Sequence, residues 1–279
     1  MAMIKVSVCV PTFNHEEYIE HMLKGALMQE TDFTFEIVIG DDASTDNSQQ
    51  IIQKYAEQYP EIIKAYLHKE NQGPDNPREF AGRNNVLQLL KACKGEYVAM
   101  CEGDDYWTDP HKLQKQVDFL DSHPDFAICH HNMLVTYEDG SPSHTFNKNS
   151  QPLVSTIDDI LQDRWFMATA SWMYRNYFLT EDFAPWHALA AAGDWALSIQ
   201  LAAKGKIGYL PETMGVYRKH SAGLSNVHSN VNVWFLKNRK EMFENVNLWL
   251  DKKYDVTIIK TVANYGEQLR KLEKIGSSI

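Results

Sequence analysis

The first part of the chain alternates between short apolar runs and segments with helical spacing, and this alternation restricts the fold most. The apolar runs have the length of buried strands and cover residues 6–10, 35–39, 62–67 and 95–101. Between them, apolar residues recur at the spacing of one helix face, for example at Ile19, Met22 and Leu23. Strands and helices that alternate in this way form βαβ units. The pattern predicts an α/β fold in which a parallel, Rossmann-like sheet carries helices on both faces.

The second half of the chain is less regular. Three segments have the composition of strands, the last of them typical of a sheet edge: 126–129, 133–137 and 208–211. Residues 195–203 are partly consistent with helical spacing, and the chain from residue 230 onward is helical and of mixed charge. We see no repeat and no linker in the sequence. We therefore expect a single domain over residues 1–225 and a C-terminal helical extension over residues 226–279.

Composition restricts the partners and the compartment. A net charge of −10 and a pI of about 5.5 argue against nucleic acid as the main partner. The start of the chain leads directly into the first strand, without a signal peptide, and no apolar run approaches the ~18 residues of a transmembrane segment. Four cysteines without a C-x-x-C pair indicate reduced, buried thiols: Cys9, Cys93, Cys101 and Cys129. We expect a cytoplasmic protein, and leave open peripheral contact with the inner face of a membrane.

Polar residues follow directly after three of the predicted strands, at 11–14, at Asp41–Asp42 and at 102–105. The carboxyl ends of parallel strands meet at one edge of the sheet, where open α/β sheets bind their ligands. Carboxylates crowded within 102–105 repel one another unless a cation lies among them, and hard oxygen ligands suit Mg²⁺ or Mn²⁺. The alternative is an acidic loop that faces solvent or caps the helix after His111. The convergence of three strand ends favours a site.

An ordered series of motifs resembles the family 2 glycosyltransferases. The series consists of VSVCVPTFN at 6–14, EIVIGDDASTD at 36–46, NQG at 71–73, RN at 83–84, GEY at 95–97, GDD at 103–105, GDW at 193–195 and YRKH at 217–220. Each motif alone is weak, but their order is specific and spans about residues 5–225.

The resemblance implies the GT-A fold and an inverting transfer from a nucleotide-diphosphate-sugar to a saccharide or lipid-linked acceptor, as in polysaccharide biosynthesis. A UDP-sugar is favoured by the resemblance, and GDP or dTDP stays open. The resemblance also implies a nucleotide-sugar-binding half at 1–110 and an acceptor-binding half at 111–225.

The same resemblance implies donor contacts after the first strand and at residues 102–105, the acidic turn: Pro11, Phe13, Asn14 and Asp104. The Phe13 ring would stack on a nucleobase, since aromatic faces stack on bases, or it would lie in the core beneath the loop.

Two further donor contacts are implied at Asp42 and Arg83. Asp42 matches the carboxylate that accepts a uracil N–H, whereas a turn or capping role is the alternative for Asp41 and Asp46. Arg83 matches a basic residue near the diphosphate. The turn-rich insertion at 74–79 makes Arg78 a competing phosphate ligand.

The resemblance implies Mn²⁺ or Mg²⁺ as cofactor. Asp104 and Asp105 are the first candidates for ligands. Glu102 is secondary, because relatives often carry Asp-Ala-Asp-Asp where this chain has Glu-Gly-Asp-Asp. His220 would complete the site as an imidazole ligand, or it is an ordinary loop histidine.

Asp194 matches the family's catalytic base, which would take the proton of the acceptor hydroxyl. The preceding residue is Gly193, where relatives often have glutamate, so a supporting carboxylate is missing or comes from elsewhere. Aspartate is also a good N-cap, and Asp194 can cap a helix beginning near Trp195 as well as act as a base.

Two other functions stay open. A sugar nucleotidyltransferase shares the sheet and the carboxylate-held Mg²⁺, but it usually has a glycine-rich, basic loop after the first strand, which residues 11–15 lack. A non-catalytic nucleotide-sugar-binding homologue would fit the departures at Glu102 and Gly193.

Overall fold

The computed structural model describes residues 3–73, 82–223 and 233–276. Its centre is a ten-stranded sheet in the order β3-β2-β1-β4-β9-β6-β10-β5, with β7 paired to β6 and β8 paired to β10. The neighbours β3, β2, β1 and β4 run parallel. This confirms the predicted parallel sheet, whose strands are β1 (Val6–Thr12), β2 (Phe35–Asp41), β3 (Ile63–Leu67) and β4 (Tyr97–Met100).

The second half of the sheet differs from the prediction in its strand lengths. β6 (Phe126–Tyr137) is one continuous strand, and it pairs in parallel with β10 (Lys206–Lys219). The segment predicted as an edge strand is thus the start of a long interior strand. A register shift between Leu210 and Thr213 lets β10 continue past Pro211, which cannot donate to the ladder. The remaining strands are short: β5 (Tyr106–Trp107), β7 (His144–Thr145), β8 (Val154–Ser155) and β9 (Met173–Arg175).

Both faces of the sheet are covered, and consecutive residues of β1 belong to different cores. Val8 and Val10 lie in one core with residues of α1 (Ile19–Leu27), α2 (Ser48–Gln58) and α4 (Lys112–Ser122). Cys9 lies in a second core on the other face. This alternation is the period of two expected of a strand. The predicted helices on both faces are confirmed, and those of the second core are α3 (Arg83–Ala92), α5 (Ile157–Leu161), α6 (Gly193–Ala202), α8 (Val233–Trp249) and α9 (Asp255–Gly276).

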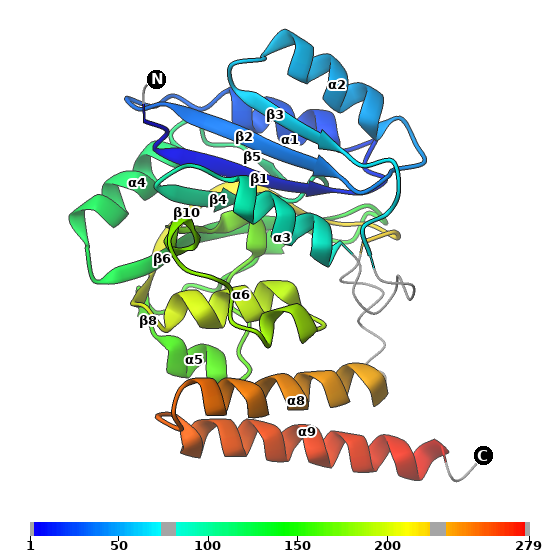
Figure 1. Ribbon diagram of the computed structural model, residues 1–279, viewed down its shortest axis with the longest axis vertical. Coiled ribbons are helices and arrows are strands. Elements are labelled where there is room, and N and C mark those ends of the chain that lie inside the picture. Colours follow the sequence, from blue (N-terminus) through cyan, green and yellow to red (C-terminus); the bar gives the residue numbers. More distant parts are fainter. Residues whose placement is uncertain (1–2, 74–81, 224–232, 277–279) are drawn as a thin grey trace.

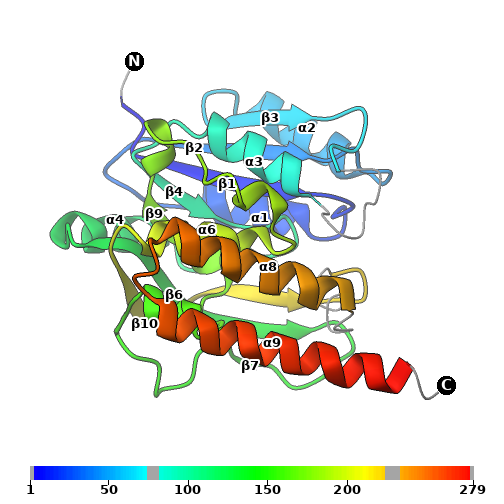
Figure 2. The ribbon, with the colours of Figure 1, turned by 60° about the horizontal axis from the view of Figure 1, so that its bottom comes forward.

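The C-terminal helices α8 and α9 are part of this second core. Phe243 of α8 and Tyr265 of α9 are buried in one cluster with Leu197 of α6. Figures 1 and 2 show the two helices running antiparallel beside α5 and α6. The predicted helical extension is confirmed, although its boundary at residue 225 falls outside the described residues. Among the helices that the structure describes, none combines the length and apolar character needed to cross a lipid bilayer.

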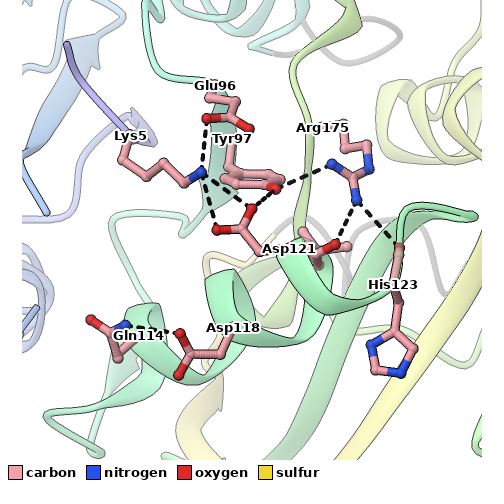
Figure 3. Close-up of polar contacts among 9 residues, drawn as sticks. Lys5, Glu96, Tyr97, Gln114, Asp118, Asp121, His123 and Arg175 are labelled. Atoms are coloured by element: carbon pink, nitrogen blue, oxygen red, sulfur yellow. Dashed lines mark hydrogen bonds and ion pairs between the residues drawn. The ribbon is translucent and has the colours of Figure 1, made fainter. Parts of the chain in front are cut away.

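The amino ends of the strands carry a network of paired charges (Figure 3). Lys5 Nζ lies 2.8 Å from Glu96 Oε2 and 3.1 Å from Asp121 Oδ2. Tyr97 Oη donates to Asp121 and accepts from Arg175 Nη1 at 3.1 Å. The charges at this edge therefore neutralise one another, which is the pattern of a structural network.

Lys112, the first residue of α4, is fully buried. Its Nζ lies 3.6 Å from the centre of the Trp107 ring, and no hydrogen-bond partner is found for it within the described residues. Burial lowers the pKa of Lys112 to about 7. An ammonium in this position is costly, because only the face of the indole compensates for its lost hydration.

Lys112→Met should stabilise the protein at pH 7 by on the order of 2–4 kcal/mol. The folded-state pKa of Lys112 lies below its unfolded value, so the unfolded chain binds more protons above about pH 7. Wild-type stability should therefore rise with pH between about 7 and 10, by up to about 1.4 kcal/mol per pH unit. Urea unfolding across this range measures the slope, which Lys112→Met should remove. The control Lys54→Met, on the exposed face of α2, should keep the wild-type slope of stability against pH. An unchanged slope in Lys112→Met would mean that Lys112 is not the group that causes it.

Candidate active site

The turns that follow β2 and β4 meet on either side of the end of β1. The backbone N–H of Asp42 donates to Thr12 O at 3.0 Å, and that of Gly103 donates to Pro11 O at 3.1 Å. A Cβ at position 103 would lie 2.6 Å from Thr12 Oγ1 and 2.7 Å from His15 Nδ1, so these two side chains would have to shift to admit a larger residue. The predicted convergence of polar segments at the carboxyl edge is present in the structure.

The loop between β1 and α1 presents an aromatic ring and a structural amide. The Phe13 side chain is 45% exposed, so its ring is not a core aromatic beneath the loop. Asn14 has a left-handed backbone with φ of 54°. Its Oδ1 accepts from Thr45 N at 2.8 Å, and its own N–H donates to Ser44 Oγ at 2.7 Å. Asn14 thus ties this loop to the turn after β2.

Two of the three aspartates at and after the end of β2 have structural roles, and the third can accept a hydrogen bond from a ligand. Asp41 accepts from Ser44 N and from Gln49 Nε2, and Asp46 accepts from Ser48 N at the start of α2. Asp42 is 1% exposed, and its Oδ1 accepts from Gln72 N at 2.6 Å.

The second oxygen of Asp42, Oδ2, is buried and has no hydrogen-bond partner within the described residues. Burial raises the pKa of Asp42, while the hydrogen bond from Gln72 opposes the rise. A buried acceptor without a donor is costly. Asp42 Oδ2 is therefore a ready acceptor for an N–H group of a ligand.

Asp104 lies between two histidines at the acidic turn. His220 Nε2 donates to Asp104 Oδ2 at 3.0 Å, and His15 Nε2 lies 3.7 Å from the same oxygen. Burial acts to raise the pKa of Asp104, but the hydrogen bond from His220 and the electrostatic interactions with His15 and His220 outweigh it and lower the pKa. The hydrogen bond to Asp104 in turn raises the pKa of His220. Asp104 is therefore held as a carboxylate.

His15 was missed by the sequence analysis. It follows Asn14 directly, so its place in the loop after β1 was the signal that could have identified it. Burial lowers the pKa of His15, which favours a neutral imidazole whose ring nitrogen can act as a ligand or acceptor.

Asp105 and Glu102 face different neighbours from Asp104. The Asp105 carboxyl is buried, its Oδ1 accepts from Arg218 N on β10 at 2.9 Å, and burial raises its pKa well above the usual range. Glu102 accepts a hydrogen bond from the Thr169 side chain. Burial, followed by the charges of Asp104 and Asp194, raises the pKa of Glu102 to about 8. Glu102 thus interacts electrostatically with Asp104, a predicted metal ligand and donor contact, and with Asp194, the predicted base.

Asp194 is in the first turn of α6, which begins at Gly193. Its Oδ1 accepts from the N–H of Trp195 at 2.8 Å. A negative side chain in this turn is favoured by the helix dipole. A Cβ at Gly193 would meet no atom within 4 Å, so a glutamate at that position would have space. Glu102, from the acidic turn, is a carboxyl group that interacts with Asp194 in this chain.

Arg83 begins α3 and is buried. Its Nη1 donates to Ala188 O, in the segment that leads to α6. Burial lowers its pKa to about 10. The structure therefore connects Arg83 to the segment before Asp194. Its competitor Arg78 lies outside the described residues.

A cavity of about 220 Å³ opens beside His220. Its lining includes Tyr18, which donates to Glu138 Oε1 at 2.8 Å, and Ser221. Three further carboxylates also line it: Glu16, Glu17 and Asp46. This acidic lining repels phosphate and suits a ligand with hydroxyl or cationic groups.

The predicted metal ligands are only partly brought together. Within residues 3–73, 82–223 and 233–276, no group of three or more His, Cys, Asp or Glu side chains is arranged to hold a metal ion. Asp104 and His220 do place a carboxylate oxygen and an imidazole nitrogen 3.0 Å apart. In nucleotide sites, Mg²⁺ commonly takes one or two protein ligands, and water and substrate phosphates supply the rest. Asp104 fits an ion held in that way, and His220 would join it by giving up the Nε2 proton that now bonds Asp104.

Comparison with known proteins agrees with this geometry. The sequence profile of Glycosyl transferase family 2 matches residues 7–183. An uncharacterised protein of Mycobacterium tuberculosis is 41% identical over 219 residues, which are 78% of this chain and 60% of the relative. The chain thus spans less than two thirds of the length of this relative.

Two solved structures share the fold. Residues 1–349 of Staphylococcus aureus TarS, in complex with UDP, superpose with a TM-score of 0.62 at 23% identity, covering 88% of this chain and 65% of that one. The mannosyltransferase PcManGT of Pyrobaculum calidifontis, in complex with GDP-Man and Mn²⁺, gives a TM-score of 0.59 at 16% identity and covers 98% of this chain and 79% of that one.

Proposed function

The chain belongs to Glycosyl transferase family 2 and has the GT-A fold, and on this basis we propose that it is an inverting glycosyltransferase. The proposed reaction transfers a sugar from a nucleotide-diphosphate-sugar to a hydroxyl of a saccharide or lipid-linked acceptor. One observation carries the proposal: the backbone N–H groups of Asp42 and Gly103 bond to adjacent carbonyl oxygens at the end of β1, which brings the two turns together. It brings an acceptor for a base N–H and a carboxylate for a diphosphate site to one sheet edge.

A UDP-sugar is the proposed donor. Asp42 Oδ2 is a buried acceptor without a partner among the described residues, and uracil has one ring N–H to donate to it. Phe13 is exposed beside this turn, where its ring can stack on a base. UDP-GlcNAc is the first donor to test, because TarS has been solved in complex with it.

Mn²⁺ or Mg²⁺ is the proposed cofactor, with Asp104 and His220 as its protein ligands. When bound, the ion would neutralise the charge that develops on the leaving diphosphate. Asp104 suits this role because its neighbours hold its pKa low, which keeps the carboxylate ionised.

Asp194 is the proposed general base. Its carboxylate would take the proton of the acceptor hydroxyl while the acceptor oxygen forms its bond to C1 and the bond from C1 to the diphosphate oxygen breaks. The interaction of Glu102 with both Asp104 and Asp194 supports this proposal, because it relates the proposed base to the diphosphate site.

Asp42→Asn should weaken the binding of UDP by about tenfold, or about 1.4 kcal/mol. An asparagine oxygen can replace Oδ1 toward Gln72, but its NH₂ group would then face the N–H of the base. Isothermal titration calorimetry with UDP and Mn²⁺ measures the change, and Asp32→Asn, on an exposed loop, is the matched control.

A thermal-shift panel of UDP-GlcNAc, GDP-mannose and dTDP-glucose tests the donor class. UDP affinity equal to wild type in Asp42→Asn, or stabilisation by GDP-mannose alone, would contradict the proposed nucleotide.

A further inference from the structure

Helix α8 contacts the chain on both sides of Asp194 through two consecutive residues. On one side, Asn238 Oδ1 accepts from Ala191 N at 2.6 Å, and Asn238 Nδ2 donates to Leu189 O at 2.8 Å. These bonds fix the backbone of the segment that enters α6 at Gly193. On the other side, the next residue of α8, Arg239, contacts Trp195.

Arg239 is a buried cation held in a defined network. Its side chain is 3% exposed, and its Nη2 lies 2.7 Å from Asp163 Oδ1. Its Nε donates to Tyr265 Oη at 3.1 Å, and the same hydroxyl donates to Asp163 Oδ2 at 2.8 Å. With one partner in the turn after α5 and one on α9, the guanidinium has a fixed place, as a buried charge requires.

The guanidinium of Arg239 lies against the side chain next to Asp194. Its carbon is 3.9 Å from the centre of the Trp195 ring, within the range of a cation–π contact. The Trp195 indole also stacks on Trp165, with ring centres 4.9 Å apart and an interplanar angle of 28°. The backbone N–H of Trp195 donates to Asp194 Oδ1 at 2.8 Å. The contacts that fix Trp195 therefore also fix the donor that orients the Asp194 carboxylate.

We infer that Arg239 is a positioning residue for Asp194, and that helix α8, with Asn238 and Arg239, is part of the catalytic unit. The inference rests on the proposed function, in which Asp194 is the general base. Arg239 acts through Trp195 and touches neither donor nor acceptor. Its loss should therefore affect the rate of the chemical step and leave the binding of the nucleotide unchanged.

The test replaces Arg239 by methionine in the full chain. With UDP-GlcNAc and Mn²⁺, Arg239→Met should lower the turnover number for UDP release by about 10- to 100-fold, since a displacement of about 1 Å can cost about 100-fold. The KM for UDP-GlcNAc and the Kd for UDP should stay within about twofold of wild type. Arg239→Lys, which keeps a cation, should recover at least part of the turnover.

Two controls separate positioning from stability. Lys240→Met makes the same kind of change at the next residue, whose ammonium pairs with Glu244 at 2.6 Å, and should leave turnover unchanged. Tyr265→Phe removes two hydrogen bonds of the Arg239 network but leaves the cation beside Trp195. It should lower the melting temperature and keep turnover within about threefold of wild type.

The outcomes are distinguishable. Turnover of Arg239→Met equal to that of Lys240→Met, or an equal loss in Tyr265→Phe, would overturn the positioning role. If Arg239→Met does not fold, Asn238→Ala, at a half-buried position, carries the test. It should lower turnover by about 3- to 10-fold and leave UDP affinity unchanged.

Asp194→Asn is measured in parallel. If it retains full turnover, the proposed base is wrong, whereas its inactivity together with full activity of the Arg239 and Asn238 variants rejects only the inference about α8.

Discussion

Asp194→Asn should reduce sugar transfer by about 1,000-fold and leave the binding of UDP within about twofold of wild type. Asparagine keeps the shape of the side chain and can still accept from the N–H of Trp195 through its oxygen. It cannot take a proton from the acceptor hydroxyl, so only the step that needs a base is lost. Turnover of UDP-GlcNAc, measured as released UDP, and calorimetric titration with UDP separate the two effects.

The matched control for this variant is Asp182→Asn, an exposed aspartate in the same half of the chain. It should keep wild-type turnover and wild-type UDP affinity. Wild-type turnover in Asp194→Asn would remove Asp194 from the role of base. A parallel loss of UDP affinity would instead mean that Asp194 contributes to the donor site, which its position in α6 does not predict.

The half of the fold that contains β1 to β4 could be predicted because its strands are short and mostly apolar, and β1, β2 and β4 are buried on both faces. In β1, Val8 and Val10 face one core and Cys9 the other, so residues 8–10 appear in the sequence as an uninterrupted apolar run. Polar residues begin where each run ends. These polar residues meet at one edge because β3, β2, β1 and β4 run parallel. The alternation of strands with helices implies this parallel direction.

The second half could not be predicted in the same detail because its contacts join residues far apart in the sequence. β6 contains buried His130, His131 and Asn132, which interrupt the apolar pattern of a strand. β10 contains Pro211, which the register shift accommodates. Without the pairing of β6 with β10, neither segment could be recognised as one long strand.

The different neighbours of the three carboxyl groups in the acidic turn could be assigned only from the structure. Glu102, Asp104 and Asp105 are close in sequence, but their side chains reach Thr169, His220 and the backbone of Arg218 respectively. Which neighbour each carboxyl meets depends on η1 (Thr169–Ser171) and on β10, and neither can be placed from local sequence. The same holds for Arg239 and Asp163, which are brought together only by the packing of α8.

Asp104→Asn should abolish the metal dependence of donor binding. In wild type, EDTA should weaken the binding of UDP by at least about tenfold, and Mn²⁺ should restore it, because one or two protein ligands and the diphosphate would share the ion. Asp104→Asn removes the carboxylate that His220 Nε2 meets at 3.0 Å. Its UDP affinity should be low and equal with and without EDTA, and turnover should fall by at least about 100-fold, since the charge on the leaving diphosphate is no longer neutralised.

Asp105→Asn is the informative comparison for this experiment, because it changes the next carboxyl of the same turn. The Asp105 carboxyl is buried and accepts from Arg218 N, and burial holds its pKa well above the usual range. A neutral amide should therefore be tolerated there, and the variant should keep its response to EDTA. Loss of that response in Asp105→Asn as well would make both aspartates metal ligands. UDP binding that is indifferent to EDTA in wild type would remove the metal from the acidic turn altogether, and Asp104 would then serve to hold His220 and His15 beside the diphosphate.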